Sequence, residues 1–342
     1  MKHIVLYVAL AVATVGCGGA GGDLGAVVSG ASTCGGDGSV GVGGDGGDSG
    51  GSGGTSPGLT PLTQPTILSA FSTAKAGSVY ATNLDGSGRQ VWFVDNHLAD
   101  QQNAFTRNAR DRFVISTGKK GSSLEHRGSD GSLISRSALT GYTSYSGLAT
   151  NSQASLVVTA GLNTATSHWQ VISMTAKGTS AKTVVDLGSS PQLVTVSDLS
   201  PDGSTVLFSV KSGSSSQEFS CGTIGSSATP LTPAGQYFDS GSFSFDGSMV
   251  TLTGRSNGGD PTSSQVYEMG SGGTGLHAVS PASTWAFTPR FSPDGQSIFF
   301  GEEVSNGSLA SNGIYRAGID GSGLALVYST NPGEAILTLV SP

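Results

Sequence analysis

The chain has 342 residues, 54 of them glycine, and only 11% are charged. This low charge excludes a disordered acidic protein, and an apolar content of 36% is enough to build a folded core. The formal net charge of −7 argues against nucleic acid as a partner, since phosphate binding needs a basic surface. The three cysteines, Cys17, Cys34 and Cys221, are too few for a disulfide scaffold and include no close pair with metal-ligand spacing.

Residues 1–16 have the pattern of a secretory signal peptide. Lys2 precedes an apolar run, Ile4 to Val15, which is too short to span a bilayer. The run ends in small residues before Cys17, which resembles the lipobox of bacterial lipoproteins, although Thr14 stands where that family usually has leucine. The resemblance implies that Cys17 is lipidated and that its lipid is the only membrane contact. The alternative is an ordinary signal peptide with an unrelated cysteine.

Residues 17–60 begin with Cys17 and continue as a glycine-rich segment. The segment has no aromatic residue to bury, so we expect a flexible tether with a reach of roughly 35 Å. Within it, Gly47 to Gly51 resembles the segment around the nucleophilic serine of chymotrypsin-like proteases. Such a serine needs a folded scaffold that delivers a histidine and an aspartate, so we expect no catalysis at Ser49.

From residue 61 onward, short apolar runs alternate with turns, and two phrases recur. The first is a strand that ends in a glycine turn, seen most clearly at Asp85-Gly86 and Asp320-Gly321. An Asp-Gly pair between apolar runs predicts a hairpin with a type I′ turn. The turn glycines recur about every 47 residues, at Gly86, Gly131, Gly178, Gly225, Gly273 and Gly321.

The second phrase is a Ser-Pro-Asp-Gly turn between two apolar runs, in which proline presets φ for a tight turn. Because its aspartate recurs once per unit, we assign that residue to turn geometry rather than to a carboxylate site. Degenerate copies stand at Phe105–Ala109 and Leu148–Ser152, and a half-copy ends the sequence at Leu339–Pro342. The clear copies contain Pro201, Asp202 and Gly203; Asp246 and Gly247; and Pro293, Asp294 and Gly295.

Each unit therefore holds four strands, and six such units predict an all-β, six-bladed β-propeller over residues 61–342. The sequence ends with a first strand, residues 335–340, and its folded part begins with a second strand, residues 66–71. We expect these strands to pair in one blade and to close the ring without an unpaired edge.

The repeats resemble the WD40-like (PD40) repeats of the TolB propeller family over residues 61–342, most specifically in three units. TolB has an α/β domain where this chain has the tether. The resemblance implies that the strand before the Pro-Asp-Gly turn is innermost. Asp198, Ser242 and Arg290 occupy matching positions on that strand and are the channel-facing candidates; alternatively, they are hydrogen-bonding residues between blades.

No set of residues in the sequence has the spacing of a catalytic or metal site, so we expect no catalytic residue, metal or cofactor. The tryptophans are expected to pack in the core or at the rim, with a sugar-stacking platform as the alternative. Cys221 is expected as a buried thiol, with a disulfide to Cys34 as the alternative. The histidines fall in four different units and are expected at the surface: His97, His126, His168 and His277.

Two functions from different classes remain. The first is a non-enzymatic, monomeric lipoprotein of the bacterial cell envelope, periplasmic or at the outer surface, whose propeller is a scaffold for a protein partner. The second is a sugar-binding or carbohydrate-active propeller, lyase-like or hydrolase-like, with its site at the channel mouth. Converging ionisable residues with shifted pKa values would favour the enzyme, and a channel lined by Ser, Thr and Gly would favour the scaffold.

Overall fold

A computed structural model describes residues 62–72, 77–95, 101–118, 121–129, 131–225, 227–255, 263–282, 285–303, 312–331 and 334–341. The predicted signal peptide, Cys17, Cys34 and the tether lie outside these residues. The elements of the described part are β-strands, as expected for an all-β fold. The described residues contain no helix that is long and apolar enough to cross a membrane.

Three sheets are antiparallel meanders of four consecutive strands each. The first contains β4 (Gln101–Phe105), β5 (Asp111–Gly118), β6 (Gly121–Gly128) and β7 (Leu133–Leu139). The second contains β8 (Tyr142–Thr150), β9 (Leu156–Asn163), β10 (Trp169–Thr175) and β11 (Lys182–Asp186). The third contains β20 (Trp285–Phe291), β21 (Ser297–Glu303), β22 (Gly313–Gly318) and β23 (Ala325–Ser329).

A fourth sheet joins the two ends of the described chain, in the order β24 (Ala335–Val340), β1 (Thr66–Ser72), β2 (Gly77–Asn83) and β3 (Gln90–Asp95). Thr66 pairs with Val340 and Ala70 pairs with Ala335. The predicted pairing of residues 66–71 with residues 335–340 is therefore confirmed, with the C-terminal strand as the first of its sheet and the N-terminal strand as the second.

The remaining strands form one sheet of eight strands. They are β12 (Leu193–Leu199), β13 (Thr205–Ser212), β14 (Ser215–Gly222), β15 (Thr229–Pro230), β16 (Tyr237–Phe243), β17 (Met249–Arg255), β18 (Ser264–Gly270) and β19 (His277–Ala278). The two halves of this sheet meet where Ser216 of β14 pairs with Tyr237 of β16. Because two sets of four strands share one sheet, the sheets do not by themselves give the predicted count of six blades.

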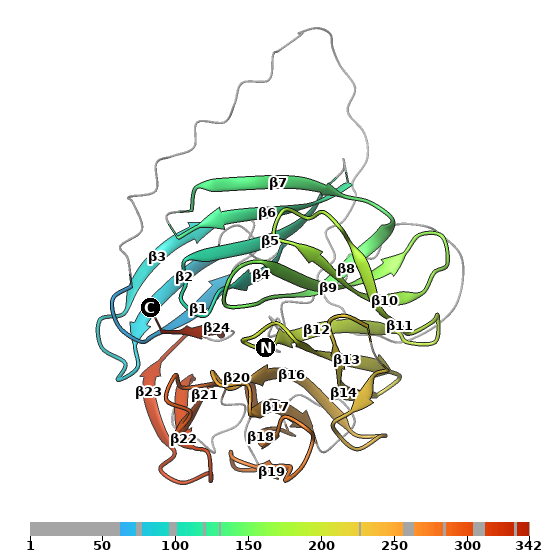
Figure 1. The fold of residues 1–342 in the computed structure, drawn as a ribbon. Helices are drawn as coiled ribbons and strands as arrows, with labels where there is room; N and C mark the ends of the chain where they lie inside the picture. Colours follow the sequence, from blue (N-terminus) through green and yellow to red (C-terminus); the bar gives the residue numbers. More distant parts are fainter. Residues whose placement is uncertain are drawn as a thin grey trace, which may run out of the picture.

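The sheets are arranged around a common centre, as in a β-propeller (Figure 1). The strands β4, β8, β12, β16, β20 and β24 contact one another in a closed circle at that centre. Apolar side chains fill the space between neighbouring sheets; Phe113 of β5 and Ile172 of β10, for example, belong to one buried cluster. The hydrophobic core is thus divided into clusters between the sheets, and polar and apolar residues together line the centre.

The two repeated phrases form turns with one shared geometry. The amide of Gly203 donates to the carbonyl of Ser200, and that of Gly86 donates to the carbonyl of Asn83. Both glycines have positive φ, +77° and +85°, and the glycines at the matching positions of the other units do as well. The prediction of a type I′ turn at Asp85-Gly86 is wrong, because only the glycine has positive φ: the loop is a type I turn followed by a left-handed residue.

The degenerate copies of the second phrase keep this turn without its glycine. The copy at Phe105–Ala109 is confirmed, since the Ala109 amide donates to Thr106 and Ala109 has φ +55°. The copy placed at Leu148–Ser152 is wrong by two residues, because the turn runs from Asn151 to Ala154. The asparagine side chain there accepts bonds from the Ser155 and Leu156 amides and stabilises a turn that the sequence pattern does not reveal.

Candidate functional site in the central channel

The centre of the ring is a channel with a narrow and a wide section. The narrow section, about 80 Å³, is lined by the ends of the innermost strands and the start of the turns that follow them. The wide section, about 320 Å³, is lined by the first halves of most of these strands. Both are lined by Asn103, Leu148, Ser197, Arg290 and Leu337, so these residues mark the junction.

Bulges in the innermost strands aim the channel residues. The register of β12 against β13 shifts between Val196 and Asp198, that of β16 against β17 shifts before Ser242, and that of β20 against β21 shifts before Arg290. A bulge inserts an unpaired residue and turns the side chain that follows it. The three predicted channel residues therefore stand at equivalent places, each directly after a bulge.

Two of these bulges hold strained residues. Ser240 of β16 has φ +59° and Thr288 of β20 has φ +46°. A branched residue such as threonine rarely adopts this conformation, which costs on the order of 1–3 kcal/mol. The Ile336 amide of β24 donates to Thr288 Oγ1 at 3.2 Å, so one strained residue is also a contact between neighbouring innermost strands.

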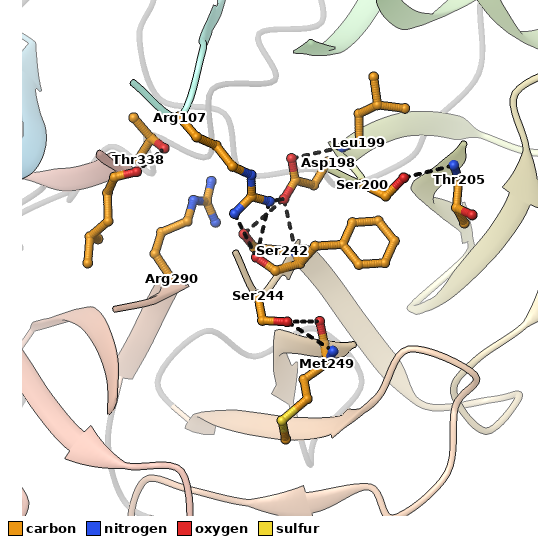
Figure 2. A network of polar contacts seen from close by, with 12 residues as sticks. Arg107, Asp198, Leu199, Ser200, Thr205, Ser242, Ser244, Met249, Arg290 and Thr338 are labelled. Carbon is orange, nitrogen blue, oxygen red and sulfur yellow. Dashed lines mark hydrogen bonds and ion pairs between the residues drawn. The ribbon is translucent and has the colours of Figure 1, made fainter. Parts of the chain in front are cut away.

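Asp198 is the centre of a polar network in the narrow section (Figure 2). Its Oδ2 accepts hydrogen bonds from Ser242 Oγ at 3.0 Å and from the Phe243 amide at 2.9 Å, both on β16. Arg107 Nη2 lies 3.2 Å from the same oxygen and forms an ion pair with it. Asp198 and Ser242 therefore line the channel and also link β12 to β16, so the two alternatives considered for these residues describe one arrangement.

Arg290 lies at the junction, inside the channel. Its Nε donates to the Leu337 carbonyl of β24 at 3.3 Å, and its Nη1 donates to the Pro289 carbonyl at 2.8 Å. Burial lowers the pKa of this guanidinium, and the positive charge of Arg107 lowers it further, against an opposite effect of Asp198. Arginine nevertheless stays protonated in proteins, so a positive charge remains in the channel.

Arg107 is a channel residue that the sequence reasoning missed. It occupies the place of proline in the degenerate turn after β4, and its guanidinium reaches Asp198 and the Phe243 carbonyl across the ring. The same guanidinium lies 5.0 Å from the ring centre of Phe245. An arginine where the repeat places proline is the one feature of the sequence that could have pointed to it.

The wide section is lined by one acid, Asp239, and a second acid, Glu218, is buried close to it. Asp239 lies 3.6 Å from Arg255, and burial raises the pKa of Asp239. Glu218 of β14 is 0% exposed. Burial raises the pKa of Glu218 to about 8, against the opposite effect of a hydrogen bond from Ser197, and the charges of Asp239 and Asp198 raise it further. Glu218 therefore holds its proton more tightly than a glutamate in water.

The described histidines lie outside the channel. His126 bonds to Asp111 at 2.7 Å, His168 to Asp186 at 2.9 Å, and His277 forms an ion pair with Glu268. Across the described ranges, no three or more His, Cys, Asp or Glu residues are placed to hold a metal ion. His97 lies outside the described residues.

The tryptophans and Cys221 are in the interior. Trp92, Trp169 and Trp285 are at most 9% exposed, so none offers a stacking platform to a sugar. Cys221 is a buried free thiol whose pKa is raised by burial to about 11. These placements agree with the packing expected for the tryptophans and with the buried thiol expected at Cys221.

Solved structures with the same fold include two TolB proteins. TolB from Acinetobacter baumannii has a TM-score of 0.61 and 15% identity, covering 82% of this chain and 67% of that chain. The putative TolB from Agrobacterium tumefaciens has a TM-score of 0.59 and 11% identity, covering 79% and 91%. Oligogalacturonate lyase in complex with manganese has a TM-score of 0.52 and 11% identity, covering 74% and 71%.

No protein-family model matches the sequence, and no curated protein matches it. At identities of 11–15%, the likeness to the solved structures shows the fold alone, a TolB-like β-propeller.

Proposed function

We propose that this chain is a non-enzymatic lipoprotein of the bacterial cell envelope, whose propeller is a scaffold for a protein partner. The observation that carries this proposal is the composition of the narrow section of the channel. Its charged residues in the narrow section are two arginines and one aspartate, and the aspartate is engaged by Arg107, Ser242 and Phe243. Such a set can bind and orient, but it contains no proton donor and acceptor poised for acid–base catalysis.

We further propose that the ring has six blades. The halves β12–β15 and β16–β19 of the eight-stranded sheet each repeat the four-strand order of the separate sheets, and each contributes one strand to the innermost circle. The pairing of Ser216 with Tyr237 is then a contact between two neighbouring blades and does not make them one blade.

The envelope location is supported by the sequence of residues 1–60. A lipid on Cys17 and a glycine-rich spacer would hold the propeller away from a membrane surface as a monomeric disc. A Cys17→Ser variant is expected to leave the membrane fraction for the soluble fraction. Retention of that variant in the membrane fraction would show that the anchor is not this lipid.

The second candidate is a sugar-binding or carbohydrate-active propeller. It is favoured by one observation, the fold likeness to an oligogalacturonate lyase. In that enzyme's structure manganese is bound, whereas the described residues here bring no comparable group of metal ligands together.

Crosslinking and affinity purification of the full-length lipidated protein from envelope fractions test the first candidate against the second. We expect the same envelope protein to be recovered with the wild type and with the turn variant Asp294→Asn, and to be lost with Ser242→Ala and Arg290→Gln. In parallel, oligogalacturonate should leave the melting temperature unchanged. If no stable partner is recovered and oligogalacturonate raises the melting temperature, the carbohydrate-binding function is favoured over the protein scaffold.

A further inference from the structure

We propose that the narrow section of the channel binds the carboxylate group of a ligand, and that Arg290 is the residue that pairs with it. The starting point is a balance of charge. Arg107, Asp198 and Arg290 are the charged residues that line this section, so one positive charge is in excess among the described residues. This inference rests on the proposed binding role of the channel.

The excess charge belongs to Arg290. Asp198 is already used, because its Oδ2 accepts three hydrogen bonds and its Oδ1 accepts one from the Leu199 amide. None of these bonds comes from Arg290, whose Nε and Nη1 are held by backbone carbonyls. Among the described residues, no atom accepts a hydrogen bond from Nη2.

This free edge belongs to a side chain that lines the cavity. Figure 2 shows the guanidinium of Arg290 turned toward that of Arg107, without a dashed line to any residue drawn. Two guanidinium groups that face one space repel each other, as the effect of Arg107 on the pKa of Arg290 reflects. An anion between them would remove this repulsion and would receive charge-assisted hydrogen bonds.

Arg290 is only partly exposed and forms no ion pair among the described residues, so its charge is less well solvated than one at the surface. The two carbonyl acceptors hold the guanidinium in place but do not neutralise it. Thr288, in its strained conformation, fixes the bulge that precedes Arg290. The site is therefore positioned before any ligand arrives.

The size of the narrow section selects the group that fits. Its volume of about 80 Å³ is well below the roughly 150 Å³ of a cavity that accepts benzene. This volume favours a small planar carboxylate, which matches the fork of a guanidinium, over a six-membered sugar ring. A ligand longer than its carboxylate would extend into the wide section.

Titration of the full-length protein with acetate, at constant pH and ionic strength against chloride, tests this inference. We expect saturable heat and a higher melting temperature in acetate, and we expect Arg290→Gln to weaken acetate binding at least about tenfold. In chloride, Arg290→Gln should melt at or above the wild type, because an unpaired charge is lost. Arg316→Gln, an exposed arginine of β22, is the matched control and should bind acetate normally.

An N-acetylated tripeptide and its C-terminal amide distinguish a carboxylate at the end of a chain from a small free acid. Binding of acetate alone identifies a small acid, and binding of the tripeptide acid but not its amide identifies a chain end. Equal melting in acetate and chloride, or unchanged acetate binding by Arg290→Gln, would overturn the proposal. So would a lower melting temperature of Arg290→Gln in chloride, since it would make Arg290 a structural cross-link. These readings do not depend on whether a protein partner is recovered.

Discussion

The hairpin turns and the channel place acidic side chains in opposite situations. In the turns, Asp202 accepts bonds from Ser200 Oγ at 2.6 Å and from the Ser204 amide at 3.0 Å, and these bonds lower its pKa. In the channel region, burial raises the pKa values of Asp239 and Glu218. A turn aspartate is stabilised by residues within two positions of it, whereas a channel acid depends on other strands and sheets. The same turn sequence can therefore form in every repeat, whereas the environment of a channel acid differs from one repeat to the next.

The largest expected difference between the channel and the turns is the loss of stability when a glycine in each region is replaced by alanine. Gly147 of the β8 bulge and Gly295 of a turn have nearly the same φ, +70° and +69°. A Cβ on Gly147 would overlap the Val196 carbonyl of β12, whereas a Cβ on Gly295 would meet nothing. We expect Gly295→Ala to cost about 1–2 kcal/mol from its backbone conformation and Gly147→Ala about 3 kcal/mol or more, measured by urea unfolding. Equal losses would mean that β8 and β12 can separate freely.

Glu218 should make the stability of the wild type fall as pH rises, an effect that the turn aspartates do not produce. The pKa of Glu218 in the folded state, about 8, is above the ordinary glutamate value of 4.5, so the unfolded state loses its proton first as pH rises. Stability should therefore fall by about 1.4 kcal/mol per pH unit from this group between these values and level off above them. Glu218→Gln should remove this fall and be more stable than the wild type at pH 8.

Unfolding of the wild type and of this variant between pH 4 and pH 9 measures the effect. Glu302→Gln is the matched comparison, because burial raises the pKa of Glu302 to about 7 and its effect should end one unit earlier. Parallel curves for wild type and Glu218→Gln would show that Glu218 is ionised in the folded protein.

Replacing an aspartate by asparagine should have a larger effect in the channel than in a turn. Asp198→Asn leaves Arg107 without its carboxylate and weakens the bonds from Ser242 and Phe243, so we expect a loss of about 2 kcal/mol. Asp294→Asn keeps an acceptor for the Gln296 amide and should cost less than about 1 kcal/mol. Chemical denaturation of the two variants compares them directly, and a greater loss for Asp294→Asn would contradict the proposed division.

The smallest effect concerns reactivity rather than stability. Because burial raises the pKa of Cys221 to about 11, its thiol should stay unmodified by a thiol reagent at pH 8 while the protein is folded. A cysteine introduced at the exposed turn residue Ser322 should react within minutes under the same conditions. Mass spectrometry of the two peptides reports both, and rapid modification of Cys221 would place it at an accessible surface.

The sequence predicted those parts of the fold that local chemistry determines. Asp294 and its neighbours repeat at a fixed spacing, and each copy needs only its own residues to form its turn, so the strands and the pairing of β1 with β24 could be predicted. Asp198, Ser242 and Arg290 could be placed because they keep one position in the repeat.

The remaining features depend on contacts between sheets. Arg107 reaches its partner on β12 only once the ring has formed, and Glu218 becomes buried only when β14 and β16 meet. The bulges contain Ser240 and Thr288 in positive φ, a conformation that serine and threonine do not favour. The residue types at these positions therefore do not predict the bulges. The type I turn at Gly86 was missed because Asp-Gly is compatible with two hairpin loops.

The pairing of β1 with β24 also bears on how the protein folds. Thr66 and Val340 are more than 270 residues apart in the chain, so this contact is among the most non-local in the fold and should form slowly. Until residues 335–340 are available, β1 presents an open edge that can accept the equivalent strand of another molecule. Ring closure is therefore the step at which folding competes with strand exchange between copies.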